Sequence, residues 1–303
     1  MITPLQQLAD PLFKEKQISV FMKRDDLLHP LISGNKWRKL KYNVAVAKEL
    51  GEHTILTFGG AYSNHIHAVA SAGSEFGFHT IGIIRGEKVL PLNATLSFAS
   101  QQGMKLHFVS REEYRKKEND DFLRHLRENF GEFYLLPEGG SNALAVKGCA
   151  EITSELNIAY DFLCCPVGTG ATVAGLVAGS QGHKQVLGFS ALKGMTDQES
   201  VITNLLAGFS GKQFKNWSVN HDYHFGGFAK LPVALLSFIT AFHAQHHILL
   251  DPVYTGKMMY GIFDLARKDF FKPGSTLIAI HTGGLQGWNG FPEHGQPPHS
   301  ILT

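Results

Sequence analysis

The chain has 303 residues, of which 44% are hydrophobic and 18% are charged, and its formal net charge at pH 7 is +2. This composition is typical of a globular protein with enough length for a large core, in one compact unit or two lobes. The small net charge excludes the basic field that nucleic-acid binding needs. No apolar run approaches the roughly 20 residues of a membrane span, so we expect no contact with a membrane.

The cysteines and the N-terminus indicate the compartment. Cys149, Cys164 and Cys165 are too few for a disulfide framework, and their spacing does not match a CxxC metal site. Residues 1–10 lack the basic region and the apolar core of an export signal. We therefore expect a cytoplasmic protein.

Short apolar runs alternate with helical stretches along the chain. The runs predict strands at Ile18–Met22, Thr54–Phe58, Thr80–Ile84, Lys105–Val109, Phe133–Leu136, Asp161–Cys165, Gln185–Phe189 and Thr276–Ile280. The stretches between them predict helices at Lys36–Leu50, Asn64–Phe76, Pro91–Gln102, Glu112–Asn129, Ala145–Leu156 and Thr172–Gly179. Several runs are apolar nearly throughout, which is typical of strands buried on both faces of a parallel sheet. The pattern predicts an α/β fold. The tail, Phe291–Thr303, is rich in Pro, Gly and His, and we expect it to be poorly ordered.

Lys36 stands where a glycine-containing turn gives way to a predicted helix. The positive end of the helix dipole and the nearby cations Arg38, Lys39 and Lys41 disfavour the ammonium form, which lowers the lysine pKa. A lysine with a lowered pKa is what Schiff-base chemistry requires. In an arbitrary chain the commoner explanation is a solvated basic helix start, and we expect Lys39 to be solvated.

The segment Gly168–Gly175 follows a predicted strand and opens a helix of small residues. Free backbone amides at such a helix start, flanked by glycines and hydroxyls, can bind a phosphate. The spacing misses the GxGxxG dinucleotide fingerprint, because Val173 occupies the last glycine position, and no Lys-Ser/Thr pair closes a Walker loop. An isolated monophosphate therefore fits better than a dinucleotide.

A third motif, Phe58–His67, predicts a strand, a glycine turn and a helix start. Ser63 and Asn64 are either caps of that helix or polar groups that face a ligand at the carboxyl end of the strand. His65 and His67 lack a nearby carboxylate or cysteine pattern, so we predict no metal site. A reactive lysine, a phosphate site and a polar loop together indicate pyridoxal phosphate.

These motifs resemble those of the 1-aminocyclopropane-1-carboxylate deaminase and D-cysteine desulfhydrase family. The matching segments, in order, are Lys23–Asp26, Ser33–Leu40, Gly60–His65, Asp251–Lys257 and His281–Gly284. The resemblance implies a two-domain fold type II pyridoxal-phosphate enzyme with open, twisted, mostly parallel sheets and helices on both faces. The large domain would comprise 1–41 and 142–303, and the small domain would be the insertion 42–141. The protein would be a homodimer that acts on a small amino acid.

The resemblance also implies roles for single residues. Lys36 would form the Schiff base with the cofactor and later move the substrate α-proton, and Asn64 would hydrogen-bond the cofactor phenolate oxygen. Ser63 would face the substrate carboxylate or act in proton transfer, and Tyr254 would lie near the ring and the substrate. The phosphate would be held by Gly168, Thr169, Gly170, Ala171 and Thr172.

Two positions separate the activities within this family. Deaminases carry Glu after the tyrosine of the Pro-Val-Tyr motif and Leu in the later His-Leu-Gly-Gly motif, whereas desulfhydrase-like members carry small hydroxyl residues at both. A carboxylate keeps the pyridine nitrogen protonated, and a hydroxyl leaves it closer to neutral. This chain has Thr255 and Thr282. The resemblance therefore favours β-elimination from D-cysteine or a related small D-amino acid, giving pyruvate, ammonia and sulfide.

Phe228 is a second departure, because family members usually supply an active-site tyrosine there, and phenylalanine has no proton to give. Tyr223 could replace that tyrosine only if the loop turned differently. The alternatives are 1-aminocyclopropane-1-carboxylate deamination to 2-oxobutanoate and ammonia, and D-serine dehydration. From other classes, the alternatives are a pyridoxal-phosphate-binding protein with little catalysis and a dinucleotide-binding regulator. We expect Glu138–Asn142 to be a turn and helix cap.

Overall fold

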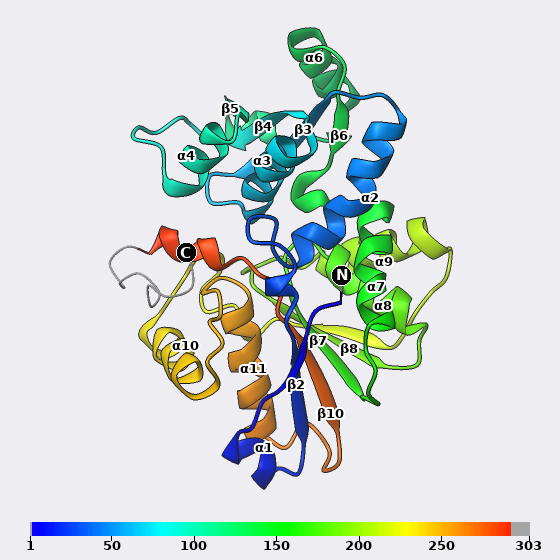
Figure 1. The fold of residues 1–303 in the computed structure, drawn as a ribbon, viewed down its shortest axis with the longest axis vertical. Coiled ribbons are helices and arrows are strands. Elements are labelled where there is room, and N and C mark those ends of the chain that lie inside the picture. The colour runs from blue at the N-terminus through cyan, green and yellow to red at the C-terminus, as the bar shows by residue number, and fades with distance from the viewer. Residues whose placement is uncertain (1, 292–303) are drawn as a thin grey trace.

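The computed structural model describes residues 2–291, which form two β-sheets (Figure 1). The strand order of the six-stranded sheet is β1 (Leu5–Gln7), β2 (Ser19–Lys23), β10 (Thr276–Ile280), β7 (Phe162–Val167), β8 (Gln185–Ser190) and β9 (Trp217–Asn220). The order of the four-stranded sheet is β5 (Lys105–Val109), β4 (His79–Arg85), β3 (Thr54–Gly60) and β6 (Tyr134–Leu136). All neighbouring strands run parallel except β1, which pairs antiparallel with β2. The predicted α/β fold with largely parallel sheets is confirmed.

Helices cover both faces of each sheet. They are α1 (Pro11–Glu15), α2 (Asn35–Glu49), α3 (Asn64–Phe76), α4 (Ala94–Gln101), α5 (Arg111–Tyr114), α6 (Asp120–Phe130), α7 (Ala143–Ser154), α8 (Ala171–Ser180), α9 (Gln198–Ser210), α10 (Val233–His246) and α11 (Thr255–Arg267). Successive side chains of β10 show why two layers are needed. Leu277 packs with residues of α1, α10 and α11, whereas Ile278 packs with residues of α7, α8 and α9. Because successive strand residues point to opposite faces, an apolar run must be covered twice.

Side-chain caps explain where two predicted helices differ from the observed ones. The predicted helix Glu112–Asn129 is interrupted because Asn119 starts a new helix, accepting hydrogen bonds from the amides of Asp121 and Phe122. The predicted helix at Pro91 begins only at Ala94, since Asn93 accepts a hydrogen bond from a first-turn amide. The elements β1, α1, α9, β9, α10 and α11 were not predicted.

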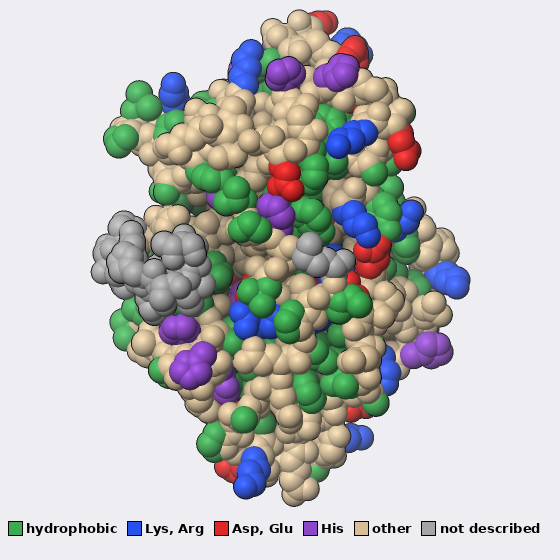
Figure 2. All heavy atoms as spheres, viewed as in Figure 1, with side chains coloured by type: hydrophobic (Ala, Val, Ile, Leu, Met, Phe, Trp, Pro, Cys, Tyr) green, Lys and Arg blue, Asp and Glu red, His purple; other side chains and the backbone are tan. Residues whose placement is uncertain are grey.

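The surface is mixed in charge on the face drawn in Figure 2, where acidic and basic side chains lie scattered among each other. Within residues 2–291, no helix combines the length and the apolar character that crossing a membrane requires. The tail predicted to be poorly ordered lies outside the described residues, apart from Phe291.

Candidate active site

A pocket of about 1070 Å³ is lined by the loops that follow β3, β6, β7 and β10. Carboxyl ends of parallel strands are the usual ligand site in α/β proteins, and this volume suits a cofactor together with a small substrate. Every predicted site residue lines the pocket except Ala171, whose side chain packs in the core under α8. The lining residues of the prediction are Lys36, Ser63, Asn64, Gly168, Thr169, Gly170, Thr172, Tyr254 and Thr282.

The start of α2 holds Lys36 at the pocket. Gly34 precedes the helix with a φ of 64°, and a Cβ at this position would lie 1.9 Å from the carbonyl oxygen of Thr282. Only glycine combines this left-handed backbone with so close an approach. The amide of Asn35 donates to the same carbonyl at 3.3 Å, so the loop after β10 fixes the helix start.

The pKa of Lys36 lies well below the ordinary value of a lysine. Burial is the main cause, and repulsion by Lys39 lowers the pKa further. Among the cations named from the sequence, Arg38 and Lys41 do not contribute in this way. Arg38 forms ion pairs with Asp25 and Glu155, and Lys41 forms one with Glu151. The predicted lowering is thus supported, but desolvation rather than a row of cations produces it.

Lys39 is buried, contrary to the expectation that it is solvated. Its side chain is only 2% exposed, and Nζ donates to the Gly139 carbonyl at 3.1 Å and to Thr169 Oγ1 at 3.4 Å. Lys36 Nζ donates to the same carbonyl at 3.4 Å. The prediction was wrong because the sequence near a helix start does not show which distant loop covers it, and here the loop that contains Gly139 does so. This second amine lies beside the predicted phosphate site.

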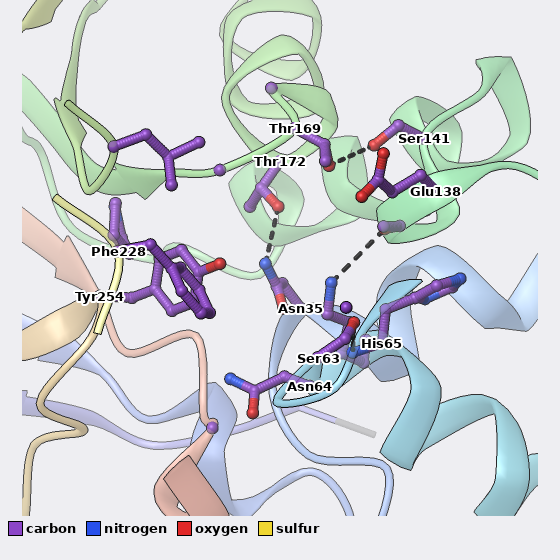
Figure 3. A pocket seen from close by; sticks show the side chains of 18 of the residues that line it. Asn35, Ser63, Asn64, His65, Glu138, Ser141, Thr169, Thr172, Phe228 and Tyr254 are labelled. Atoms are coloured by element: carbon purple, nitrogen blue, oxygen red, sulfur yellow. Dashed lines mark hydrogen bonds between the residues drawn. The ribbon is translucent and has the colours of Figure 1, made fainter. Parts of the chain in front are cut away.

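The predicted phosphate site lies at the N-terminus of α8. Gly170, with a φ of 84°, precedes the helix, and no side chain caps its first amides. Thr169 Oγ1 hydrogen-bonds Ser141 Oγ at 2.5 Å, and Asn35 Nδ2 donates to Thr172 Oγ1 at 3.0 Å (Figure 3). Uncapped amides, hydroxyls and the ammonium of Lys39 together match the acceptors of a phosphate monoester.

The polar loop after β3 both caps a helix and lines the pocket. Ser63 Oγ caps α3, accepting from the amides of His65 and Ile66 at 3.2 and 3.4 Å, and Ser63 also lines the pocket. Asn64 lines the pocket and accepts a hydrogen bond from Gln286 Nε2 at 3.0 Å. Within the described part of the chain, no group of three or more His, Cys, Asp or Glu side chains could hold a metal ion.

Tyr254 and Phe228 lie against each other at one wall of the pocket, with ring centroids 6.2 Å apart (Figure 3). Burial, followed by the charges of Asp251 and Glu138, raises the pKa of Tyr254, so the phenol keeps its proton. Tyr223 does not take the place of the missing tyrosine, because it is buried in the core and its hydroxyl donates to Asp264 at 2.8 Å.

The sequence predicted that Thr255 and Thr282 both place a hydroxyl at the cofactor, and the structure differs from this at Thr255. It is fully buried and does not line the pocket. Its hydroxyl donates to Asp251 Oδ2 at 2.7 Å and accepts from the Asp251 amide at 2.8 Å. Both hydrogen-bonding capacities therefore close the turn that starts α11, and only Thr282 of the pair reaches the pocket.

The sequence predicted only a turn and a helix cap for the segment Glu138–Asn142, but this segment also lines the pocket. Asn142 caps α7 as expected, but Glu138, Gly139 and Ser141 line the pocket. A Cβ on Gly139 would lie 2.5 Å from Thr169 Oγ1, so glycine lets this loop approach Thr169 at the predicted phosphate site. The adjacent glycines were the available signal. Gln198, which donates to the Gly168 carbonyl at 3.0 Å, carried no signal at all.

The sequence matches the model of a family described as "pyridoxal-phosphate dependent enzyme" over residues 2–283. The chain belongs to this family. A putative 1-aminocyclopropane-1-carboxylate deaminase of Pyrococcus abyssi is 30% identical over 299 residues, which cover 94% of this chain and 90% of the relative. A mitochondrial protein of Arabidopsis thaliana, named bifunctional D-cysteine desulfhydrase/1-aminocyclopropane-1-carboxylate deaminase, is 30% identical over 291 residues, covering 88% and 73%.

A crystal structure described as that of an ACC deaminase homologue superimposes with a TM-score of 0.81 at 27% identity, covering 95% of this chain and 91% of the other. The predicted family resemblance, the fold type II architecture and the cofactor pyridoxal 5′-phosphate are thereby confirmed.

Proposed function

We propose that this pyridoxal-phosphate enzyme is a lyase that removes the β-substituent of D-cysteine or a related small D-amino acid. With D-cysteine, one water is consumed, and pyruvate, ammonia and hydrogen sulfide are released. The observation that carries the proposal concerns the pocket lining from segment 251–255 and from the loop after β10, where Tyr254 and Thr282 supply hydroxyl groups and Gln286 supplies an amide. Among the described lining residues, neither segment 251–255 nor the loop after β10 offers a carboxylate. A hydroxyl beside the pyridine nitrogen leaves it near neutral, which suits elimination better than ring opening.

The residues that would hold the cofactor lie at the same pocket. Lys36 would bind it covalently, and Asn64 would hydrogen-bond its phenolate oxygen. The phosphate would occupy the start of α8, held by Gly168, Thr169, Gly170, Ala171 and Thr172, with the amide of Ala171 taking part although its side chain does not. When bound, the cofactor withdraws electrons from the α-carbon of an amino acid and thereby acidifies its hydrogen.

The protein's own groups would divide the proton transfers. Burial lowers the pKa of Lys36, which favours the neutral amine, and Nζ would take the α-proton in that form. Ser63 would face the substrate carboxylate. Tyr254, whose raised pKa preserves its proton, would hydrogen-bond the departing sulfur.

A panel of substrates tests the proposal on cofactor-loaded protein: D- and L-cysteine, D-serine and 1-aminocyclopropane-1-carboxylate. We expect pyruvate and sulfide in equal amounts from D-cysteine. The absence of turnover with D-cysteine, alongside clear 2-oxobutanoate from the cyclopropane, would refute it. A substrate-dependent change in the cofactor spectrum separates an enzyme from a passive carrier.

Deamination of 1-aminocyclopropane-1-carboxylate is the second candidate, because the names of the Pyrococcus and Arabidopsis relatives include that activity. D-Serine dehydration is distinguished in the same panel by pyruvate without sulfide. Borohydride reduction followed by peptide mapping tests the lysine. A pyridoxyl adduct at Lys36 is expected, and an adduct at Lys39 instead would overturn the assignment.

We also propose a large domain of 1–41 and 142–303 and an inserted small domain of 42–141. In support, β3 to β6 fall within the insertion, and the six strands of the other sheet fall outside it. Homodimeric assembly and a cytoplasmic location remain predictions. Light scattering on the purified holoenzyme tests the first, and a monomer at micromolar concentration would contradict it.

A further inference from the structure

Lys257, in the first turn of α11, is a buried cation whose partners are backbone carbonyls. It is 1% exposed, and Nζ donates to the oxygens of Ala191 at 3.3 Å, His224 at 2.9 Å and Gly227 at 2.7 Å. Within residues 2–291 it forms no ion pair. An ammonium group has three N–H donors, so three carbonyls satisfy it completely. Asp251 lies close enough for its charge to raise the pKa of Lys257, but among the described residues no carboxylate accepts a hydrogen bond from it. Burial of such a cation is unfavourable, and its place in the structure therefore requires an explanation.

The three carbonyls belong to two loops that Lys257 joins. Ala191 directly follows β8, whereas His224 and Gly227 lie in the loop between β9 and α10. The backbone of that loop is unusual, because Phe225 and Ala229 have φ values of 53° and flank two glycines that also have positive φ. Non-glycine residues in the left-handed region are strained unless the surroundings hold them. The ammonium of Lys257 holds this turn through its hydrogen bonds to the carbonyls of His224 and Gly227.

The same turn forms part of the pocket. Gly226, Gly227 and Phe228 line it, and the Phe228 ring stands at an angle of 67° to Tyr254. Tyr254 immediately precedes α11, three residues before Lys257. The start of α11 thus carries the Tyr254 ring, and Lys257 in its first turn holds the loop that carries the Phe228 ring.

We propose that Lys257 is a positioning residue of the active site. Its ammonium fixes the turn 224–228 and so sets the Phe228 ring against Tyr254, where the two rings form the surface that receives an uncharged β-substituent of the substrate. This inference rests on the proposed lyase function only for the identity of the substrate. Burial lowers the pKa of Lys257 to about 8, so the group still carries all three donors at pH 7.

The direct test is amide hydrogen exchange of the holoenzyme, read by mass spectrometry on peptides that cover 224–229. Lys257→Met keeps the volume of the side chain and removes its donors. We expect exchange in this segment to rise by about tenfold or more, with the remaining peptides unchanged, since three hydrogen bonds are lost. The control is Met258→Leu, a buried neighbour on α11 that does not line the pocket. Unchanged exchange in Lys257→Met would overturn the proposal.

Kinetics with D-cysteine supply the second readout. Lys257→Met should raise KM by about tenfold with a smaller effect on kcat, because a misplaced ring weakens binding rather than the proton transfers. Phe228→Ala should do the same. If Lys257 acts through Phe228, the double variant should resemble either single variant. Effects on KM that multiply would show that Lys257 does not act through this ring.

Two further outcomes keep the test decisive. Should Lys257→Met fail to fold, Lys257→Gln retains two donors and should show intermediate exchange in 224–229. Wild-type exchange in a folded Lys257→Gln variant would also count against the proposal. If no substrate in the panel is turned over but the exchange still rises, the proposed lyase function fails and the positioning role stands.

Discussion

Lys36 and Lys39 donate to one acceptor, the carbonyl oxygen of Gly139, at 3.4 and 3.1 Å. Two amines one helical turn apart are thus held at a single point, at which neither forms an ion pair within the described residues. Burial lowers the pKa of both, and each cation would destabilise the other. Both side chains line the pocket, and Lys39 also donates to Thr169 Oγ1, at the predicted phosphate site.

Replacing Lys39 should weaken cofactor binding without removing the reactive lysine. In Lys39→Met, we expect pyridoxal phosphate to bind about tenfold or more weakly, because a charge-assisted contact to the phosphate is lost. An absorbance titration of cofactor-free protein measures this. Lys41→Met on the same helix, which loses an ion pair with Glu151 and a contact with the Tyr42 ring outside the pocket, is the matched control. Binding by Lys39→Met that equals this control would place the phosphate elsewhere.

The lowered pKa of Lys36 should be visible in the pH dependence of cofactor incorporation. An ordinary lysine amine gains reactivity about tenfold per pH unit between pH 7 and 10, because the neutral form becomes more abundant up to a pKa near 10.5. For Lys36 the neutral form predominates above a much lower pH, so incorporation should be nearly flat over the alkaline part of this range. Stopped-flow absorbance after mixing with the cofactor gives the rate. A continuous tenfold rise per unit would contradict burial of the amine.

Phe228→Tyr restores the hydroxyl that the pocket wall lacks. We expect this variant to gain activity with 1-aminocyclopropane-1-carboxylate relative to D-cysteine by about tenfold, since one more proton donor faces the substrate. The ratio of the two kcat/KM values is the measured quantity. Phe209→Tyr, at a partly exposed position outside the pocket, controls for the added phenol. An unchanged ratio would mean that the second hydroxyl does not govern the choice between the reactions.

The loop that leads into Lys36 is anchored by buried charges. Asp25, which is fully buried, accepts from Thr3 at 2.7 Å and from two nitrogens of Arg38 at 3.1 Å, while Arg38 also pairs with Glu155. Asp25→Asn should lower the free energy of unfolding by about 3 kcal/mol, because the buried Arg38 loses one of its two carboxylate partners.

Denaturant unfolding of the cofactor-free protein tests the Asp25 substitution. Asp121→Asn, which breaks an exposed pair with Arg124, should change the free energy of unfolding by less than about 0.5 kcal/mol. Equal effects of the two substitutions would show that the buried charges do not stabilise this loop.

The sequence predicted those strands and helix starts that depend on neighbouring residues along the chain. The strands β3, β4 and β7 are nearly continuous apolar runs, and the start of α8 follows one of them through glycines, so periodicity and turn residues sufficed. By contrast, α10 is apolar on several sides and follows an irregular loop. Its sequence therefore lacks the one-sided apolar pattern that distinguishes a helix from a buried strand.

The site residues that escaped prediction depend on distant contacts. Thr255 and Thr282 look equivalent in the sequence, and only the carboxylate of Asp251 withdraws the first from the pocket. Lys39 looks solvated until Gly139, a hundred positions away, covers it. Such roles are set by which loops meet between two sheets, and no local propensity carries that information.

The closeness of Gly34 to the carbonyl of Thr282 bears on the order in which the protein is completed during synthesis. The backbone that the turn before Lys36 packs against is synthesised 248 positions after the turn itself. A nascent chain that has not reached residue 284 therefore lacks part of the backbone that holds Lys36 in place. The surroundings of this lysine are complete only after the loop that follows β10 has been synthesised.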